Sequence, residues 1–133
     1  MILVDTSVLI GFFKGEKTPA GSYFKTVLER NIPFGITSLI YQEILQGAKS
    51  RREYERLDRY LSTQRFYHPK DPVLSFAAAA RIYFLCRRKG ITVRSTVDCL
   101  IAQIAIEHNL LLLHSDKDFE AMAEVIPLKW PTI

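Results

Sequence analysis

The sequence has only two cysteines, three scattered histidines and no long uninterrupted run of hydrophobic residues. Cys86 and Cys99 both lie in apolar helical patterns, so we expect buried thiols in a reducing compartment, and their spacing matches no zinc site. The histidines are too dispersed in the chain to suggest zinc either. No low-complexity tract or internal repeat interrupts the chain.

Export and membrane signals are also lacking. No basic segment precedes the apolar start of the chain, so no secretory signal is recognisable. The most apolar later stretch, residues 73–86, contains Arg81 and is shorter than the roughly 20 residues of a membrane-spanning helix. We therefore expect a soluble cytoplasmic protein with no membrane contact.

The composition is that of one globular domain. Hydrophobic residues make up 48% and charged residues 24% of 133 positions, so we expect a single domain with one core over residues 1–133. Lys and Arg number 18 and Asp and Glu 14, which gives a net charge of +4. This mild basic excess is compatible with a polyanionic partner.

Short apolar segments alternate with helical patterns along the whole chain. Capping residues indicate where helices start, as at Thr18 before Pro19 and at Ser50, which is followed by Glu53. Strands are expected at residues 2–4, 34–36, 66–67, 110–114 and 126–129. Because these strands are apolar throughout, we predict an α/β fold with a central, mostly parallel sheet flanked by helices on both faces.

Four carboxylates fall where such a fold would bring them to one rim. Asp5 directly follows the first strand, and Asp116 follows the strand around residue 112. Glu43 and Asp98 lie on helices that would lean over the same edge, where parallel sheets bind ligands. Clustered carboxylates repel one another, and binding a divalent cation is the commonest reason to gather them. The pattern therefore predicts a metal-dependent enzyme acting on phosphodiesters.

Asp5 and Glu43 each have a simpler structural interpretation. Asp5 precedes Thr6 and Ser7 and could serve only as a helix cap. Glu43 lies among apolar helical neighbours, where a carboxylate is costly unless it is paired, but its head could also reach water.

The later acids also have capping alternatives. Ser95 and Asp98 match a capping box, although one carboxylate oxygen could cap while the other binds metal. Ser115 and Asp118 match a second capping box, which would leave Asp116 as the fourth ligand. Asp118 stays open as the alternative acid.

Taken together, the four acidic segments resemble the PIN-domain ribonucleases, specifically the VapC-type toxins of toxin–antitoxin pairs. The matching segments are residues 2–10, 37–47, 98–105 and 111–119. The resemblance implies a parallel sheet flanked by helices, an acidic pocket for Mg²⁺ or Mn²⁺, and endonucleolytic cleavage of RNA. It also implies a homodimer held inactive by a small antitoxin protein.

Carried over by position, the resemblance makes Asp5, Glu43, Asp98 and Asp116 the catalytic and metal-binding acids. Thr6 or Ser115 would orient a ligand or a metal-bound water. Outside the resemblance, proximity in the sequence to Asp5 and Asp98 makes Lys14 and Arg94 candidates for contacts with the RNA backbone.

Two other functions compete with this interpretation. A phosphatase with an aspartyl nucleophile would also place Asp after its first strand, but such enzymes generally have a second acid two residues later, where this chain has Ser7. A catalytically inactive, nuclease-like domain could instead serve as an RNA- or protein-binding module. Retention of all four acids argues against that module, because binding alone does not require their mutual repulsion.

Overall fold

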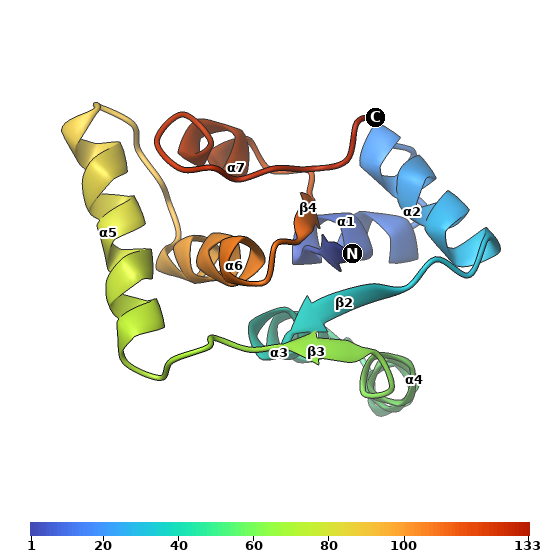
Figure 1. The fold of residues 1–133 in the computed structure, drawn as a ribbon. Coiled ribbons are helices and arrows are strands. Elements are labelled where there is room, and N and C mark those ends of the chain that lie inside the picture. Colours follow the sequence, from blue (N-terminus) through green and yellow to red (C-terminus); the bar gives the residue numbers. More distant parts are fainter.

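The sheet is parallel throughout and is made of four short strands. The computed structural model describes residues 1–133, and its strands lie in the order β3-β2-β1-β4 (Figure 1). All three neighbouring pairs are parallel. The strands are β1 (Ile2–Val4), β2 (Phe34–Thr37), β3 (Arg65–Tyr67) and β4 (Leu111–Leu113). The parallel α/β architecture predicted from the sequence is confirmed.

Seven helices cover this sheet on both faces. Helix α1 contacts both α2 and α3, and α3 contacts α4, while α5, α6 and α7 form a second contacting group. The first group connects β1 to β3. In the second group, α5 and α6 form the crossover from β3 to β4, which lies on the other side of β1, and α7 follows β4. No helix is long and apolar enough to cross a lipid bilayer. The helices are α1 (Thr6–Phe13), α2 (Pro19–Glu29), α3 (Ser38–Gln46), α4 (Arg51–Leu61), α5 (Leu74–Arg88), α6 (Thr96–Glu107) and α7 (Lys117–Met122).

The core is a single cluster of 29 buried residues in which the strands lie at the centre. Leu3 and Val4 of β1 and Leu112 and Leu113 of β4 are fully buried. A parallel sheet that carries helices on both faces buries most of its strand positions, which explains the apolar runs of β1 and β4. The polar exceptions are Thr37 at the end of β2 and Arg65 at the start of the edge strand β3.

Most helices start where the sequence places a capping side chain. Thr18 accepts a hydrogen bond from the backbone N–H of Gly21 (2.9 Å), and Ser50 accepts one from that of Glu53 (3.1 Å). Thr37 caps α3 in the same way. These hydroxyls satisfy backbone donors that lack a partner inside the helix.

The predicted last strand at residues 126–129 is wrong. This segment is irregular, and it contacts β4 through one hydrogen bond, from the backbone N–H of Leu112 to the carbonyl oxygen of Lys129 (2.8 Å). Pro127 lacks a backbone N–H and therefore cannot donate to a ladder, which limits pairing at this position. The single bond nevertheless fixes the chain just before Trp130.

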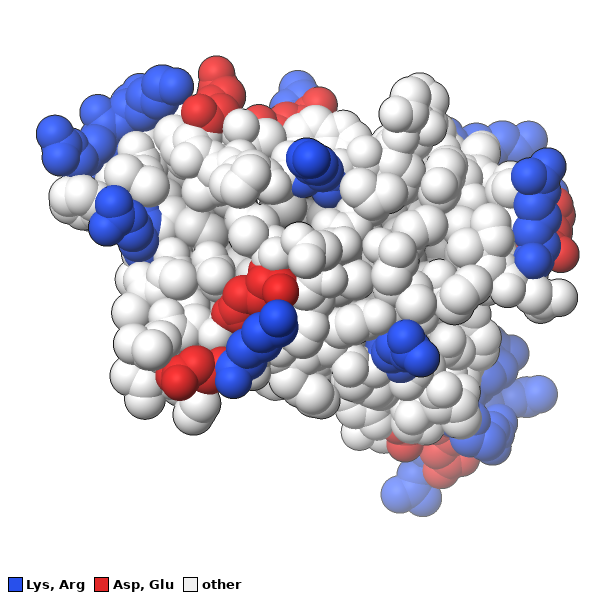
Figure 2. Space-filling view, in the orientation of Figure 1, with Lys and Arg blue, Asp and Glu red and all other residues white.

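Charged side chains are unevenly spread over the face seen in Figure 2. Basic residues gather over the end of α5, which carries Arg87 and Arg88, and over α4, while much of the surface between them is uncharged. The basic excess therefore does not form one continuous patch on this face.

Replacing Gly35 with Ala should destabilise the fold by about 1–3 kcal/mol, because the new methyl group would overpack the sheet. A Cβ at Gly35 would collide with the Tyr67 ring and lie 3.1 Å from the Arg65 carbonyl oxygen. Gly47→Ala is the matched control, because its Cβ would meet atoms no closer than 3.5 Å. Urea unfolding would measure both variants, and equal stabilities would contradict the expected clash.

Candidate active site

The strand ends β1 and β4 lie side by side at the switch in strand order. The backbone N–H of Asp5 donates to the carbonyl oxygen of Leu113 (3.0 Å), so the first residue after β1 is tied to the end of β4. Asp116 lies three residues beyond Leu113. In open parallel sheets, a crevice forms where successive connections leave in opposite directions, and ligands bind there.

Asp5 is both a helix cap and a buried acid with a free oxygen. It is 4% exposed, and its Oδ2 accepts hydrogen bonds from the backbone N–H (3.0 Å) and hydroxyl (2.7 Å) of Ser7. Its Oδ1 is buried without any partner. Burial raises the pKa of Asp5, the Ser7 bonds oppose that rise, and the charge of Asp116 adds to it. A buried carboxylate oxygen without a donor is costly, and a cation bound at this oxygen would offset that cost.

Glu43 reaches toward the same crevice from α3. The Thr6 hydroxyl donates to Glu43 Oε1 (3.1 Å), which links the first turn of α1 to α3. Burial raises the pKa of Glu43, the Thr6 bond lowers it, and the charge of Asp5 raises it further. Thr6 thus orients an acid, while a role toward a metal-bound water stays a prediction.

Asp98 is an acid whose pKa lies well above its usual range. It lies in the first turn of α6, its carboxylate accepts no hydrogen bond, and its pKa is raised from 3.8 to about 7. Burial is the largest cause, followed by the charges of Asp5, Asp116, Glu43 and Asp118. The predicted capping box is wrong here, because the Ser95 side chain makes no capping bond. Asp98 therefore has no structural partner that would explain its position.

Asp98, Asp116 and Asp118 form the tightest part of the site. One carboxylate oxygen from each lies within 4.8 Å of the others. Asp5 and Glu43 are outside this group, but their charges contribute to the raised pKa of Asp98. The negative charges of the other four acids therefore all act on Asp98.

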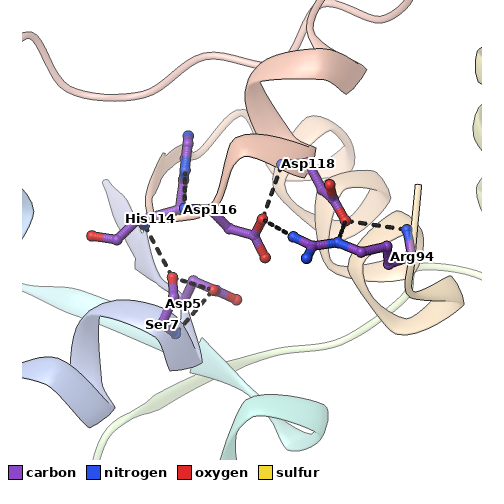
Figure 3. A network of polar contacts seen from close by, with 7 residues as sticks. Asp5, Ser7, Arg94, His114, Asp116 and Asp118 are labelled. Carbon is purple, nitrogen blue, oxygen red and sulfur yellow. Dashed lines mark hydrogen bonds and ion pairs between the residues drawn. The ribbon is translucent and has the colours of Figure 1, made fainter. Parts of the chain in front are cut away.

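The predicted capping role of Ser115 is also wrong. Asp116 is the N-cap of α7, and its Oδ1 accepts the backbone N–H of Asp118 (2.9 Å), as Figure 3 shows. Asp118 Oδ2 accepts the backbone N–H (3.1 Å) and Nε (3.3 Å) of Arg94. Arg94 Nη2 also lies 3.7 Å from Asp116 Oδ1. Both acids are in the cluster, and Asp118 is the one whose charge Arg94 balances most closely.

The remaining predicted residues have different surroundings. Lys14 is exposed at the end of α1 and makes no ion pair, whereas Arg94 is already paired with two acids. Their contacts with RNA stay predictions. Ser115 contributes its backbone N–H, which donates to the Ser7 hydroxyl (3.0 Å), rather than its own hydroxyl.

Sequence reasoning missed the role of Ser7 and the position of His114. Ser7 relays a hydrogen bond from the loop after β4 to Asp5, and its place two residues after an aspartate was the available signal. His114 Nδ1 accepts the backbone N–H of Asp116 (3.2 Å), and burial lowers the pKa of this imidazole. No sequence pattern indicated that contact.

The donors fit a hard divalent cation. Every acid in the cluster offers oxygen, which suits Mg²⁺ or Mn²⁺ better than zinc. Asp5 Oδ1 lacks a donor, and the carboxylate of Asp98 lacks one altogether. A cation would supply the positive charge that Arg94 alone does not.

Comparison with known proteins gives consistent matches over nearly the whole chain. Residues 2–125 match the PIN domain family. VapC ribonuclease Mb1587 of Mycobacterium bovis and ribonuclease VapC11 of Mycobacterium tuberculosis are each 35% identical over 130 residues, covering 97% of this chain and 96% of each relative.

Solved structures share the same fold. VapBC2 from Rickettsia felis, bound to a promoter DNA fragment, aligns with a TM-score of 0.73 at 19% identity and covers 98% of both chains. A toxin–antitoxin complex from Klebsiella pneumoniae aligns with a TM-score of 0.64 at 25% identity, over 97% of this chain and 99% of that chain.

Proposed function

Since this chain belongs to the PIN-domain family, we propose that it is a divalent-metal-dependent endoribonuclease and the toxin of a toxin–antitoxin pair. The proposal depends on one observation above all. Asp98 has no hydrogen-bond partner, its pKa is raised to about 7, and it lies against two further carboxylates. Such an arrangement is unfavourable unless a cation binds there.

Asp5, Asp98 and Asp116 would hold the principal ion, which we propose to be Mg²⁺ with Mn²⁺ as the alternative. Glu43 would complete its surroundings or help to bind a second ion, and Asp118 is the alternative acid. When bound, such ions activate a water and relieve negative charge on a phosphodiester.

The protein's own groups would hold these acids in place. Ser7 fixes one oxygen of Asp5 and leaves Oδ1 free, and Thr6 fixes Oε1 of Glu43. The Ser115 backbone N–H in turn orients the Ser7 hydroxyl. These bonds reduce the reorganisation needed when substrate arrives.

An antitoxin protein would regulate the enzyme, and the active form would be a homodimer. Structures similar to this one were solved as toxin–antitoxin complexes. Helix α5 and the segment before it also expose large apolar side chains, which is unusual for a surface without a partner. Their exposed fractions are 70% for Val73, 68% for Leu74, 49% for Phe76 and 56% for Phe84.

A nuclease assay tests this function. Wild-type protein should cleave structured RNA with Mg²⁺ or Mn²⁺ and lose that activity in EDTA. RNA binding without cleavage in either metal would favour the inactive binding module instead. Addition of the cognate antitoxin should inhibit cleavage.

Replacing Ser7 with Ala should weaken activation by Mn²⁺ by about 10- to 100-fold, the usual effect of losing a residue that orients a metal ligand. The reason is loss of the 2.7 Å bond to Asp5 and of the link to Ser115. Mn²⁺ dependence of RNA cleavage would measure it. Thr63→Ala, which removes an exposed hydroxyl bonded to the Tyr60 carbonyl oxygen, is the control. Equal Mn²⁺ dependence in both variants would contradict the role of Ser7.

A further inference from the structure

A cavity of about 590 Å³ opens directly beside the acidic cluster. Its walls come from the start of α2, the segment after β4, α7 and the segment around Trp130. Its volume is within the range of about 300–1,000 Å³ that is typical of small-ligand sites. Asp116 lines this cavity and also belongs to the cluster, so a ligand held at the acids would extend into it.

Trp130 lines this cavity, packs against neighbouring residues and remains 36% exposed. The hydrogen bond from Leu112 to Lys129 fixes the preceding residue against β4. The Trp130 and His114 rings meet edge to face, with centroids 4.9 Å apart. His114 lies in turn 5.1 Å from the ring of Phe119, which is fully buried. An immobilised, partly exposed indole is a ready stacking surface.

His114 also sets the distance between this indole and the acids. Its Nδ1 accepts the Asp116 backbone N–H, while its ring packs against Trp130. Nε2 is buried and makes no hydrogen bond, so the contacts of this imidazole with the indole are those of ring packing. One imidazole thus fixes both the acidic loop and the indole.

The charges around the cavity favour a base over a phosphate. Glu120 lines the cavity and would repel a phosphate placed inside it. Its carboxylate could instead accept hydrogen bonds from the N–H groups of a base. Lys117 is exposed, makes no ion pair and also lines the cavity, where it could meet a neighbouring phosphate.

We propose that this cavity binds the base of an unpaired nucleotide next to the cleaved phosphodiester, stacked on the Trp130 indole. The proposal rests on the proposed function, because it requires RNA to be the substrate. It places single-stranded segments of RNA, rather than duplexes, at the active site.

Trp130 is the only tryptophan in the chain, so tryptophan fluorescence, excited selectively over that of the six tyrosines, reports on this cavity alone. In the Asp98→Asn background with Mg²⁺, which prevents cleavage and leaves the cavity intact, titration with octameric oligo(A) or oligo(U) should quench the fluorescence saturably. The matching A–U duplex and an abasic octamer of the same length should quench much less.

Trp130→Ala should weaken binding of the labelled octamer by roughly 5- to 150-fold, the usual effect of losing one stacked base. Fluorescence anisotropy would measure it. Trp130→Phe should retain most of the affinity, and circular dichroism melting would show that it is folded. Tyr54→Ala, at an exposed aromatic on α4, should bind normally.

Octamer binding without quenching, or equal affinity of the Trp130→Ala, Trp130→Phe and Tyr54→Ala proteins, would overturn the base site. RNA cleavage by the wild-type protein distinguishes failure of the base site from failure of the proposed function. If wild type cleaves RNA, an absence of quenching removes the base site alone. If it neither binds nor cleaves RNA, the proposed function fails as well.

Discussion

Asp98→Asn should lower RNA cleavage by more than about 100-fold and should raise the stability of the metal-free protein at neutral pH. The loss of cleavage activity should exceed the roughly 10- to 100-fold effect that is usual for residues that only orient a metal ligand, because Asp98→Asn removes a direct ligand. The stability of the metal-free protein should rise because the amide of the new Asn side chain carries no negative charge that would repel Asp116 and Asp118. A residue that only supports the fold would not show these opposite effects.

Single-turnover cleavage in Mn²⁺ and thermal unfolding in EDTA would measure the two effects on the same preparation. Glu29→Gln is the matched control, since Glu29 is an exposed acid on α2 that pairs only with Lys25. It should change neither quantity appreciably. An active Asp98→Asn protein, or one that is less stable than wild type in EDTA, would contradict the assignment.

Metal-free wild type should lose stability relative to Asp98→Asn as the pH rises from about 4 to about 7. The pKa of Asp98 is about 7 in the folded protein and near 3.8 in the unfolded chain. The folded state therefore binds more protons between these values, so this contribution is fully present below pH 3.8 and is lost as the pH rises through about 7. Taking the difference between the two proteins cancels the titrating groups that do not interact with Asp98, His114 included.

Divalent metal should restore the stability that the metal-free protein loses as the pH rises. Binding at 100 times the dissociation constant adds about 2.7 kcal/mol, which corresponds to an increase on the order of 10 °C in Tm for a chain of this length. The shift should be larger at pH 8 than at pH 5, because protons compete for the same oxygens. Differential scanning fluorimetry across pH, with Mg²⁺ or EDTA, measures it. A pH-independent difference between wild type and Asp98→Asn in EDTA would refute the raised pKa.

The features that local sequence determines were predictable. Uninterrupted apolar runs predicted the strands around Leu3 and Leu112, and single hydroxyl side chains predicted the helix caps at Thr18 and Ser50. In each case the deciding interaction lies within a few residues, so periodicity and capping chemistry suffice. The order of the four acidic segments then indicated the rim where they meet.

The errors arose where two capping patterns compete or where distant residues decide the outcome. Ser115 matched a capping pattern, but Asp116 caps α7 because its own carboxylate accepts the backbone N–H of Asp118. The carboxylate of Asp118 is directed to Arg94, 24 residues earlier, and that pairing has no local signature. The bond from Ser115 to Ser7 joins opposite ends of the chain and could not be predicted from spacing.

Crystallising the protein with Mn²⁺ and locating the ion by anomalous scattering would test the central claim most directly. We expect a peak between Asp5 Oδ1, Asp98 and the Asp116–Asp118 pair, with metal–oxygen distances of about 2.0–2.2 Å, close to those of Mg²⁺ sites. Crystals grown in millimolar Mn²⁺ with these carboxylates ordered and no anomalous peak within about 3 Å of them would contradict it.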